Sequence, residues 1–187
     1  MPEYRRRYLP GGTYFFTLVT ASRARIFADE RARLFLRQSL HECRKKRPFE
    51  IIAFVLLPDH LHTIWTLPSG DEDYSTRWGA IKAKFTSDWL EAGGNEQRVA
   101  ASKQRRRQRG VWQPRFHEHT IRDGEDFEHH FHYSHYNPVK HGYCQCPYEW
   151  PYSTFHRYVS EGWYPREWCC GGNERQGWMD LSTTVGE

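Results

Sequence analysis

The sequence lacks any apolar run that approaches the length of a membrane span, and residues 1–5 contain no apolar signal core. It also lacks a phosphate-binding P-loop, a dinucleotide-binding glycine fingerprint and an internal repeat. These absences count against a membrane protein, two common classes of nucleotide-binding enzyme and a solenoid. We therefore expect a cytoplasmic protein without a membrane partner.

Cysteine is scarce, and its spacing is irregular. The five cysteines stand at positions 43, 144, 146, 169 and 170. In a cytoplasmic protein thiols stay reduced, so we expect no disulfide. The pairs Cys144–Cys146 and Cys169–Cys170 lack the two-residue spacer of zinc knuckles, which disfavours a structural zinc site. A zinc-stabilised RNA-binding protein that uses these cysteines remains the weakest alternative.

Aromatic residues and clustered basic residues are what the sequence does contain. Eleven Phe, eleven Tyr and eight Trp supply burial area to a 187-residue chain of single-domain size. The net charge is only +4, but Lys and Arg gather at positions 5–7, 44–47 and 103–109. Basic side chains contact phosphates and aromatic rings stack on unpaired bases, so this combination favours a nucleic-acid partner.

Hydrophobic periodicity predicts an α+β protein. We expect strands at 13–20, 49–56, 60–67 and 111–121, and helices at 29–46, 74–90 and 123–136. Ser75 or Thr76 would cap the second helix, Asp123 would cap the third, and Pro138 would end it. The order indicates a ferredoxin-like split β-α-β antiparallel sheet with helices on one face. A catalytic domain at 1–143, with a mobile basic loop at about 92–110, would be followed by an irregular C-terminal extension at 144–187.

Two histidines separated by one residue, His60 and His62, fall in a predicted strand. Side chains alternate along a strand, so both imidazoles share a face with Ile64, while Leu61 and Trp65 share the other. Two neighbouring imidazoles make half of a divalent-metal site. Taken alone, such a pair is more often the solvent-facing side of a strand.

Tyr133 and Asn137 lie four positions apart in the third predicted helix and therefore on one of its faces. Two imidazoles and an amide oxygen can hold a divalent ion, which polarises a phosphate oxygen, and a phenolate can then attack phosphorus. A phosphotyrosine retains the phosphodiester energy, so a 3′-hydroxyl can later reseal the strand. These residue types suit the breaking and rejoining of DNA.

Three motifs carry a family resemblance: LPDHLH at 57–62, WQPRF at 112–116 and YSHYNPVKHG at 133–142. Together they resemble the single-tyrosine HUH transposases, most closely the branch of REP-associated tyrosine transposases. The resemblance implies a metal-dependent single-stranded DNA endonuclease and strand-transferase with a 5′-phosphotyrosine intermediate. Its partners would be single-stranded and hairpin DNA of REP elements, the repeated extragenic palindromes of bacterial chromosomes, and it would be nucleoid-associated. Protein partners are not indicated.

The resemblance assigns roles to individual residues. Tyr133 matches the nucleophile, His60 and His62 match the metal ligands, and Asn137 matches the position that completes the metal site. Mg²⁺ is the expected ion, with Mn²⁺ as a substitute. The expected DNA-binding residues are basic: Arg5, Arg6, Arg7, Arg105, Arg106, Arg107, Arg115 and Lys140.

Several alternatives stay open. Tyr136 could be the nucleophile, but it points about 100° away from Asn137 around the helix. His117 and His119 form a second spaced pair, for which we expect no metal role because the family carries an aromatic residue where His117 stands. We expect the other histidines of the helix to be ordinary polar residues, with a smaller chance that His129 acts on the tyrosine. A domesticated, non-catalytic REP hairpin-binding protein is the main functional alternative.

Overall fold

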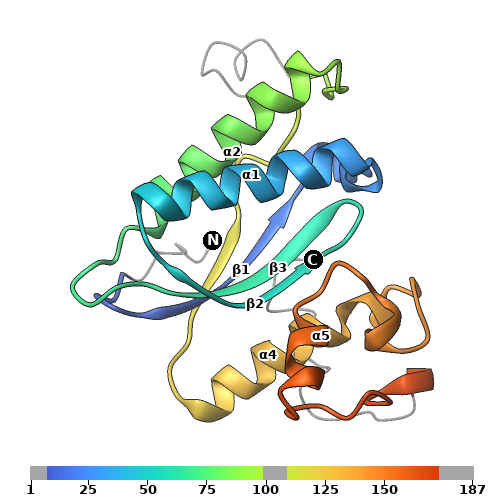
Figure 1. The fold of residues 1–187 in the computed structure, drawn as a ribbon. Helices are drawn as coiled ribbons and strands as arrows, with labels where there is room; N and C mark the ends of the chain where they lie inside the picture. Colours follow the sequence, from blue (N-terminus) through green and yellow to red (C-terminus); the bar gives the residue numbers. More distant parts are fainter. Residues whose placement is uncertain (1–7, 99–108, 173–187) are drawn as a thin grey trace, which may run out of the picture.

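The computed structural model describes residues 8–98 and 109–172, which fold around a four-stranded antiparallel sheet (Figure 1). The strands are β1 (Thr13–Val19), β2 (Glu50–Leu56), β3 (His60–Thr66) and β4 (His117–Thr120). Their order across the sheet is β2-β3-β1-β4, and every neighbouring pair is antiparallel. The order of the strands confirms the predicted ferredoxin-like α+β class.

Helices cover both faces of this sheet (Figure 1). The two helices of the split β-α-β pattern, α1 (Glu30–Lys46) and α2 (Tyr74–Glu91), pack side by side on one face, as expected. The other face is covered by α4 (Gly124–Lys140) and the short α5 (Phe155–Ser160). The third helix is therefore an addition to the ferredoxin-like unit, and it encloses the face that carries the histidine pair.

Capping side chains define where the helices begin. Asp123 accepts a hydrogen bond from the backbone N–H of Asp126, which confirms the predicted cap of α4. The predicted cap of α2 is wrong, because Asp73 rather than Ser75 or Thr76 takes that position and accepts from the N–H of Thr76. A carboxylate accepts more strongly than a hydroxyl, and Asp73 stands one residue before the first helical turn.

The prediction that Pro138 ends the third helix is also wrong. The helix runs to Lys140 with Pro138 inside it. Proline removes one N–H donor, but the turn is recovered beyond it, because His141 donates to the carbonyl of Asn137 and Tyr143 to that of Pro138. Asn137 therefore stays in helical geometry, and Lys140 lies on the same face as Tyr133.

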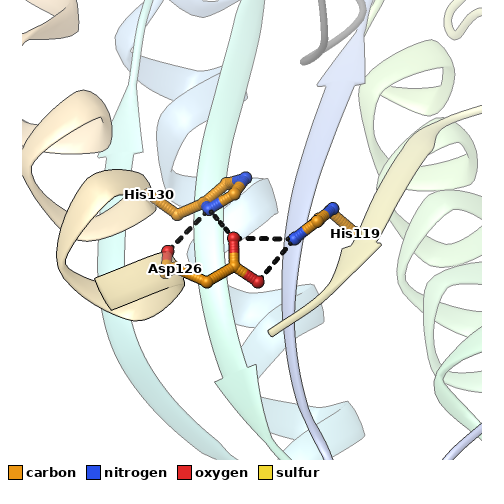
Figure 2. Close-up of side chains that lie close together, drawn as sticks. All are labelled: His119, Asp126 and His130. Atoms are coloured by element: carbon orange, nitrogen blue, oxygen red, sulfur yellow. Dashed lines mark hydrogen bonds and ion pairs between the residues drawn. The ribbon is translucent and has the colours of Figure 1, made fainter. Parts of the chain in front are cut away.

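Side chains as well as a short connection join β4 to α4 (Figure 2). His119 on β4 forms a hydrogen bond with Asp126 on α4, and Asp126 also contacts His130 one turn further along. The edge strand and the first turns of the helix are thereby linked.

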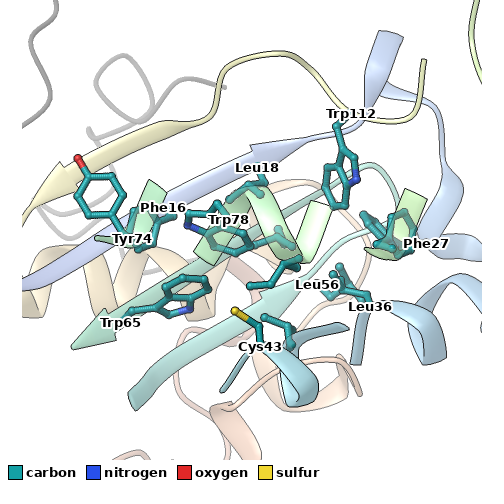
Figure 3. Close-up of a cluster of buried hydrophobic side chains, with 14 of the residues drawn as sticks. Phe16, Leu18, Phe27, Leu36, Cys43, Leu56, Trp65, Tyr74, Trp78 and Trp112 are labelled. Atoms are coloured by element: carbon teal, nitrogen blue, oxygen red, sulfur yellow. The ribbon is translucent and has the colours of Figure 1, made fainter. Parts of the chain in front are cut away.

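The main hydrophobic core lies between the sheet and the pair α1 and α2 (Figure 3). Trp65 of β3 stacks on Trp78 of α2 with ring centroids 4.1 Å apart. A second core on the opposite face contains Ile64 of β3 and Tyr133 of α4. The alternation predicted for the histidine strand is confirmed, since Leu61 and Trp65 enter one core and Ile64 enters the other.

The C-terminal extension follows the free edge of β2. Leu56 N–H donates to the carbonyl of Tyr152, and Thr154 N–H donates to that of Phe54, both at 2.9 Å. Further along, Cys146 forms a disulfide with Cys170. The prediction that all thiols are reduced is therefore wrong for this pair, because the fold returns a distant segment to the loop after α4, which sequence spacing does not reveal.

The predicted mobile loop is described only at its two ends. Gln97 N–H donates to the carbonyl of Gly110 at 2.7 Å, and Arg109 forms an ion pair with Glu96. These contacts close the base of the loop. Among the described helices, none combines the length and the apolar character that crossing a membrane requires.

Candidate active site

The two histidines of β3 lie beneath α4. His60 is 1% exposed and His62 is fully buried. Their rings are 5.1 Å apart and nearly perpendicular, and Phe15 of β1 stacks against His62. This burial excludes the solvent-facing alternative, so each imidazole requires polar partners.

His60 is oriented by the residue before it. Its Nδ1 lies 2.7 Å from Oδ1 of Asp59, whose other oxygen accepts from Arg23 at 3.2 Å. Burial pushes the pKa of the Asp59 carboxyl upward, but the hydrogen bond with His60 and the Arg23 guanidinium outweigh burial and hold the pKa below its usual value. An ionised carboxylate only accepts, so His60 carries a proton on Nδ1.

His62 is oriented across the sheet. It pairs with Thr17 of β1 in the strand register, and its Nδ1 lies 2.9 Å from the Thr17 hydroxyl. When this Nδ1 carries the proton, Nε2 offers its lone pair on the other side of the ring. Hydrogen bonds of this kind fix the rings of metal-binding histidines.

Tyr133 and Asn137 approach the pair from α4. The ring of Tyr133 stands edge-on to His62 with centroids 5.4 Å apart, and Asn137 Oδ1 lies 3.4 Å from Nε2 of His60. The structure therefore brings together all four residues that the sequence singled out for catalysis and metal binding. His60 and Asn137 are 77 positions apart in the chain.

The contact between His60 and Asn137 suits a cation. Because the His60 proton is on Nδ1, a neutral ring presents a lone pair at Nε2, and the amide oxygen presents another. These two atoms lie 3.4 Å apart, so a cation placed between them would be bound by both. Neighbouring ligands of Mg²⁺ are about 3 Å apart, because each bond is about 2.1 Å long. The donor set of His60, His62 and Asn137 thus fits a divalent ion.

Lys140 covers the tyrosine. Its Nζ donates to the Tyr133 hydroxyl at 3.1 Å and lies 4.8 Å from the ring centroid. Tyr133 is 1% exposed, whereas Lys140 is half-buried. Lys140, which the sequence predicts as a phosphate contact, therefore also contacts the hydroxyl of the candidate nucleophile on the same helix.

Of the remaining expected DNA-binding residues, one lies in the described part of the chain. Arg115 is exposed just before β4. Arg5, Arg6 and Arg7, like Arg105, Arg106 and Arg107, lie outside the described residues.

The other candidates on α4 have structural partners. His132 hydrogen-bonds the Tyr164 hydroxyl at 2.6 Å, and His135 contacts the Thr154 hydroxyl at 2.9 Å. Burial lowers the pKa of His135 to about 3, so it is neutral at physiological pH. Tyr136 packs near Cys169 in a separate cluster. His135 is buried and His132 is half-buried, and both hydrogen-bond to residues of the C-terminal extension.

Sequence reasoning missed three residues of the site. Asp59 and Thr17 hold the two imidazoles, and the ring of His141 lies 5.0 Å from that of His60. Asp59 could have been found from the sequence, because an acidic residue directly before a histidine pair can orient one of the imidazoles. Thr17 carries no such signal, because its role follows from the strand register.

Comparisons with known proteins identify the family of the chain. The family model described as "Transposase IS200 like" matches residues 10–135. A REP-associated tyrosine transposase of Escherichia coli strain K12 is 44% identical over 168 residues, which are 90% of this chain and 91% of the relative. A Haemophilus influenzae relative is 39% identical over 173 residues, 92% of this chain and 95% of the relative.

A solved structure of a REP-associated tyrosine transposase bound to a REP hairpin is also similar. It superposes with a TM-score of 0.74 at 43% identity, covering 90% of this chain and 91% of that one. The sequence similarity and the structural similarity therefore cover nearly the same share of this chain. The chain belongs to the IS200-like transposase family and, within it, to the REP-associated tyrosine transposases.

Proposed function

We propose that this chain is a divalent-metal-dependent single-stranded DNA endonuclease and strand-transferase that acts on REP hairpins through Tyr133. The observation that carries the proposal is the meeting of Tyr133 and Asn137 on α4 with His60 and His62 on β3. A phenol beside two imidazoles and an amide oxygen supplies a nucleophile and a cation site within one cluster.

In the proposed step, the Tyr133 hydroxyl oxygen attacks the scissile phosphorus. The bond from phosphorus to the 3′-oxygen breaks, the phenolic proton is released, and the 3′-oxygen takes up a proton to leave as a hydroxyl. A 5′-phosphotyrosine remains on the enzyme. Attack on that phosphotyrosine by another 3′-hydroxyl reverses the bond changes and completes strand transfer.

Lys140 has two tasks in this scheme. Its ammonium stabilises the negative charge that develops on the Tyr133 oxygen. Because Lys140 covers the buried phenol, it must also move aside when the phosphate enters, and it can then contact that phosphate. This combines the contact seen in the structure with the role expected from the sequence.

His60, His62 and Asn137 would hold the metal ion. A bound Mg²⁺, or Mn²⁺ in its place, supplies Lewis-acid polarisation of a phosphate oxygen. Asp59 and Thr17 keep the imidazole rings directed toward the site.

The proposed partner is single-stranded DNA next to a REP hairpin. A solved relative of 43% identity is described as bound to a REP hairpin. In this chain the net charge is +4, and Arg115 is exposed beside β4. We accordingly place the protein with chromosomal DNA in the bacterial cytoplasm.

We also propose that residues 1–143 form the catalytic unit and that 144–187 pack on it. The pairing of 152–154 with β2 supports this division for the described part of the extension.

A non-catalytic hairpin-binding protein is the second candidate. It is favoured by one observation, the burial of Tyr133. The presence of both histidines, Asn137 and Lys140 around that tyrosine favours the enzyme instead.

A trapping experiment separates the two candidates. Single-stranded REP DNA is incubated with the protein and Mn²⁺, and covalent protein–DNA adducts are resolved on a denaturing gel. We expect an adduct from the wild type and from Y136F, and none from Y133F. An adduct of equal yield from Y133F would refute the assigned nucleophile, and hairpin binding without any adduct would favour the second candidate.

A further inference from the structure

A second cluster of metal-ligating side chains lies outside the candidate active site (Figure 2). It combines His119 of β4 with Asp126 and His130 of α4, whose nitrogen and oxygen ligand atoms all lie within 4.8 Å of one another. Nε2 of His119 is 2.8 Å from Oδ2 of Asp126, and Nδ1 of His130 is 3.2 Å from Oδ1. The two imidazole rings stack 4.3 Å apart.

The proposed cleavage does not use this cluster. The Phe15 ring lies between the candidate active site and the second cluster, with its centroid 5.6 Å from that of His62 and 4.8 Å from that of His130. The sequence alone disfavoured a metal role for His119 as the partner of His117. In the fold, the relevant partners of His119 are on α4 instead.

Two groups of the cluster have shifted pKa values. Burial alone would raise the pKa of Asp126, but hydrogen bonds from His119 and Arg122 lower it to about 2. Burial lowers the pKa of His130 to about 4.

The surroundings support a defined geometry. The Arg122 N–H donates to Asp126 Oδ2 at 2.9 Å and holds the carboxylate in place. Asp126 and His130 are buried, whereas the His119 side chain is 28% exposed, so solvent reaches the cluster from the β4 side. Imidazole nitrogens and carboxylate oxygens are common ligands of zinc in proteins.

We propose that His119, Asp126 and His130 form a second metal site, for which Zn²⁺ is the best match to two imidazoles and one carboxylate. Neighbouring zinc ligands are about 3.3 Å apart, because the bonds are about 2.0–2.1 Å long, so small side-chain rotations suffice. His130 Nδ1, which now faces the Asp126 main-chain carbonyl at 2.8 Å, becomes a ligand when the ring proton moves to Nε2. His119 shifts its proton from Nε2 to Nδ1 in the same way, and no proton is lost.

Such a site would tie the edge strand to the helix that carries Tyr133. Because metal binding favours the folded state, Zn²⁺ would stabilise the junction of β4 and α4. The site is therefore structural in its direct effect and separate from the proposed chemistry.

The test uses Co²⁺ as a visible probe in the full-length chain without DNA. The variant H62A removes a ligand of the candidate active site, so that remaining binding reports the second cluster. We expect H62A to bind about one equivalent of Co²⁺ with a visible absorption band, and Zn²⁺ to displace it. Adding H119A should abolish the band and lower the affinity for Co²⁺ by about 10- to 100-fold or more, since even substitutions of residues that only support a metal site cause losses of that size.

The double variant H62A/H41A is the matched control, because His41 is an exposed histidine on α1, and it should behave as H62A does. If H119A impairs folding by circular dichroism, the near-isosteric D126N replaces it and should cause the same loss. Unchanged Co²⁺ affinity and spectrum in both folded variants would overturn the proposal, as would a complete absence of binding to H62A. None of these readouts depends on strand cleavage.

Discussion

His60 and His62 are neighbours on one strand, yet different groups orient their rings. Asp59 accepts a hydrogen bond from Nδ1 of His60, whereas the Thr17 hydroxyl faces His62 and can either donate or accept. The tautomer of His60 is thus fixed by charge, and that of His62 is adjustable. The family resemblance assigned both imidazoles as ligands, whereas the partners that orient them, in the adjacent turn and on the neighbouring strand, are seen only in the fold.

Replacing both histidines should separate cleavage from binding. In H60A/H62A we expect no covalent adduct with REP DNA, because the ion has lost two of its three protein ligands. Hairpin affinity, measured by a mobility shift, should stay within a few fold, because phosphate contacts dominate such binding. Loss of hairpin binding together with cleavage, in a variant of normal circular dichroism, would show that the pair is structural.

Lys140 should matter for the rate of cleavage. K140M removes the ammonium beside the Tyr133 oxygen, so we expect the single-turnover cleavage rate to fall about 10²-fold, on the order of the loss of one charge-stabilising donor. K140R should retain part of the rate. K45M, which changes an exposed lysine of α1, serves as the control. A rate for K140M equal to that of K45M would rule out the role given to Lys140.

At the scale of elements, Arg77 joins the start of α2 to the end of α1. This arginine is 2% exposed and donates to both oxygens of Asp71 and to the carbonyl of Pro48. The hydrogen bond from Arg77 is the largest reason why the pKa of Asp71 lies below its usual value of 3.8. A buried guanidinium that loses its counter-ion is strongly destabilising.

The variant D71N should therefore lower the free energy of unfolding. We expect a loss of about 1–3 kcal/mol at pH 7, toward the lower end because Asp71 is one-third exposed. The carboxylate contributes above pH 3.8 and less as the pH falls through its lowered pKa, so the difference from wild type should shrink in acid. Urea titrations at pH 7 and pH 3 measure this, with E72Q as an exposed control. An equal difference at both pH values would contradict the assignment.

The elements themselves were largely predictable, and their ends were not. Alternation and helical spacing place β1, β2, β3, α1 and α2 within a few residues of the structure. The end of α4 was missed because Pro138 loses only one donor, and the next turn compensates for it. That difference matters, since it keeps Asn137 and Lys140 on the helical face of Tyr133.

At the scale of the whole molecule, α4 and the described part of the C-terminal extension cover the face of the sheet that carries His60 and His62. The extension pairs with β2 and returns to the loop after α4 through Cys146 and Cys170. Neither contact could be inferred from spacing, because both depend on where segments more than 20 residues apart meet.

Reduction of this disulfide should destabilise the chain. The cysteines are 24 positions apart, and a cross-link of that span contributes about 2–4 kcal/mol. We expect dithiothreitol to lower the unfolding midpoint of the wild type and of C144S, but not that of C146S/C170S. Identical wild-type midpoints with and without the reductant would show that the disulfide does not form in solution.

The central claim is that Tyr133, rather than a neighbour on α4, becomes bound to DNA. The most direct measurement is mass spectrometry of the proteolysed adduct formed with a 3′-labelled REP strand and Mn²⁺, which locates the modified tyrosine. We expect the phosphonucleotide on Tyr133. Its presence on Tyr136, or on any other residue, would contradict the account.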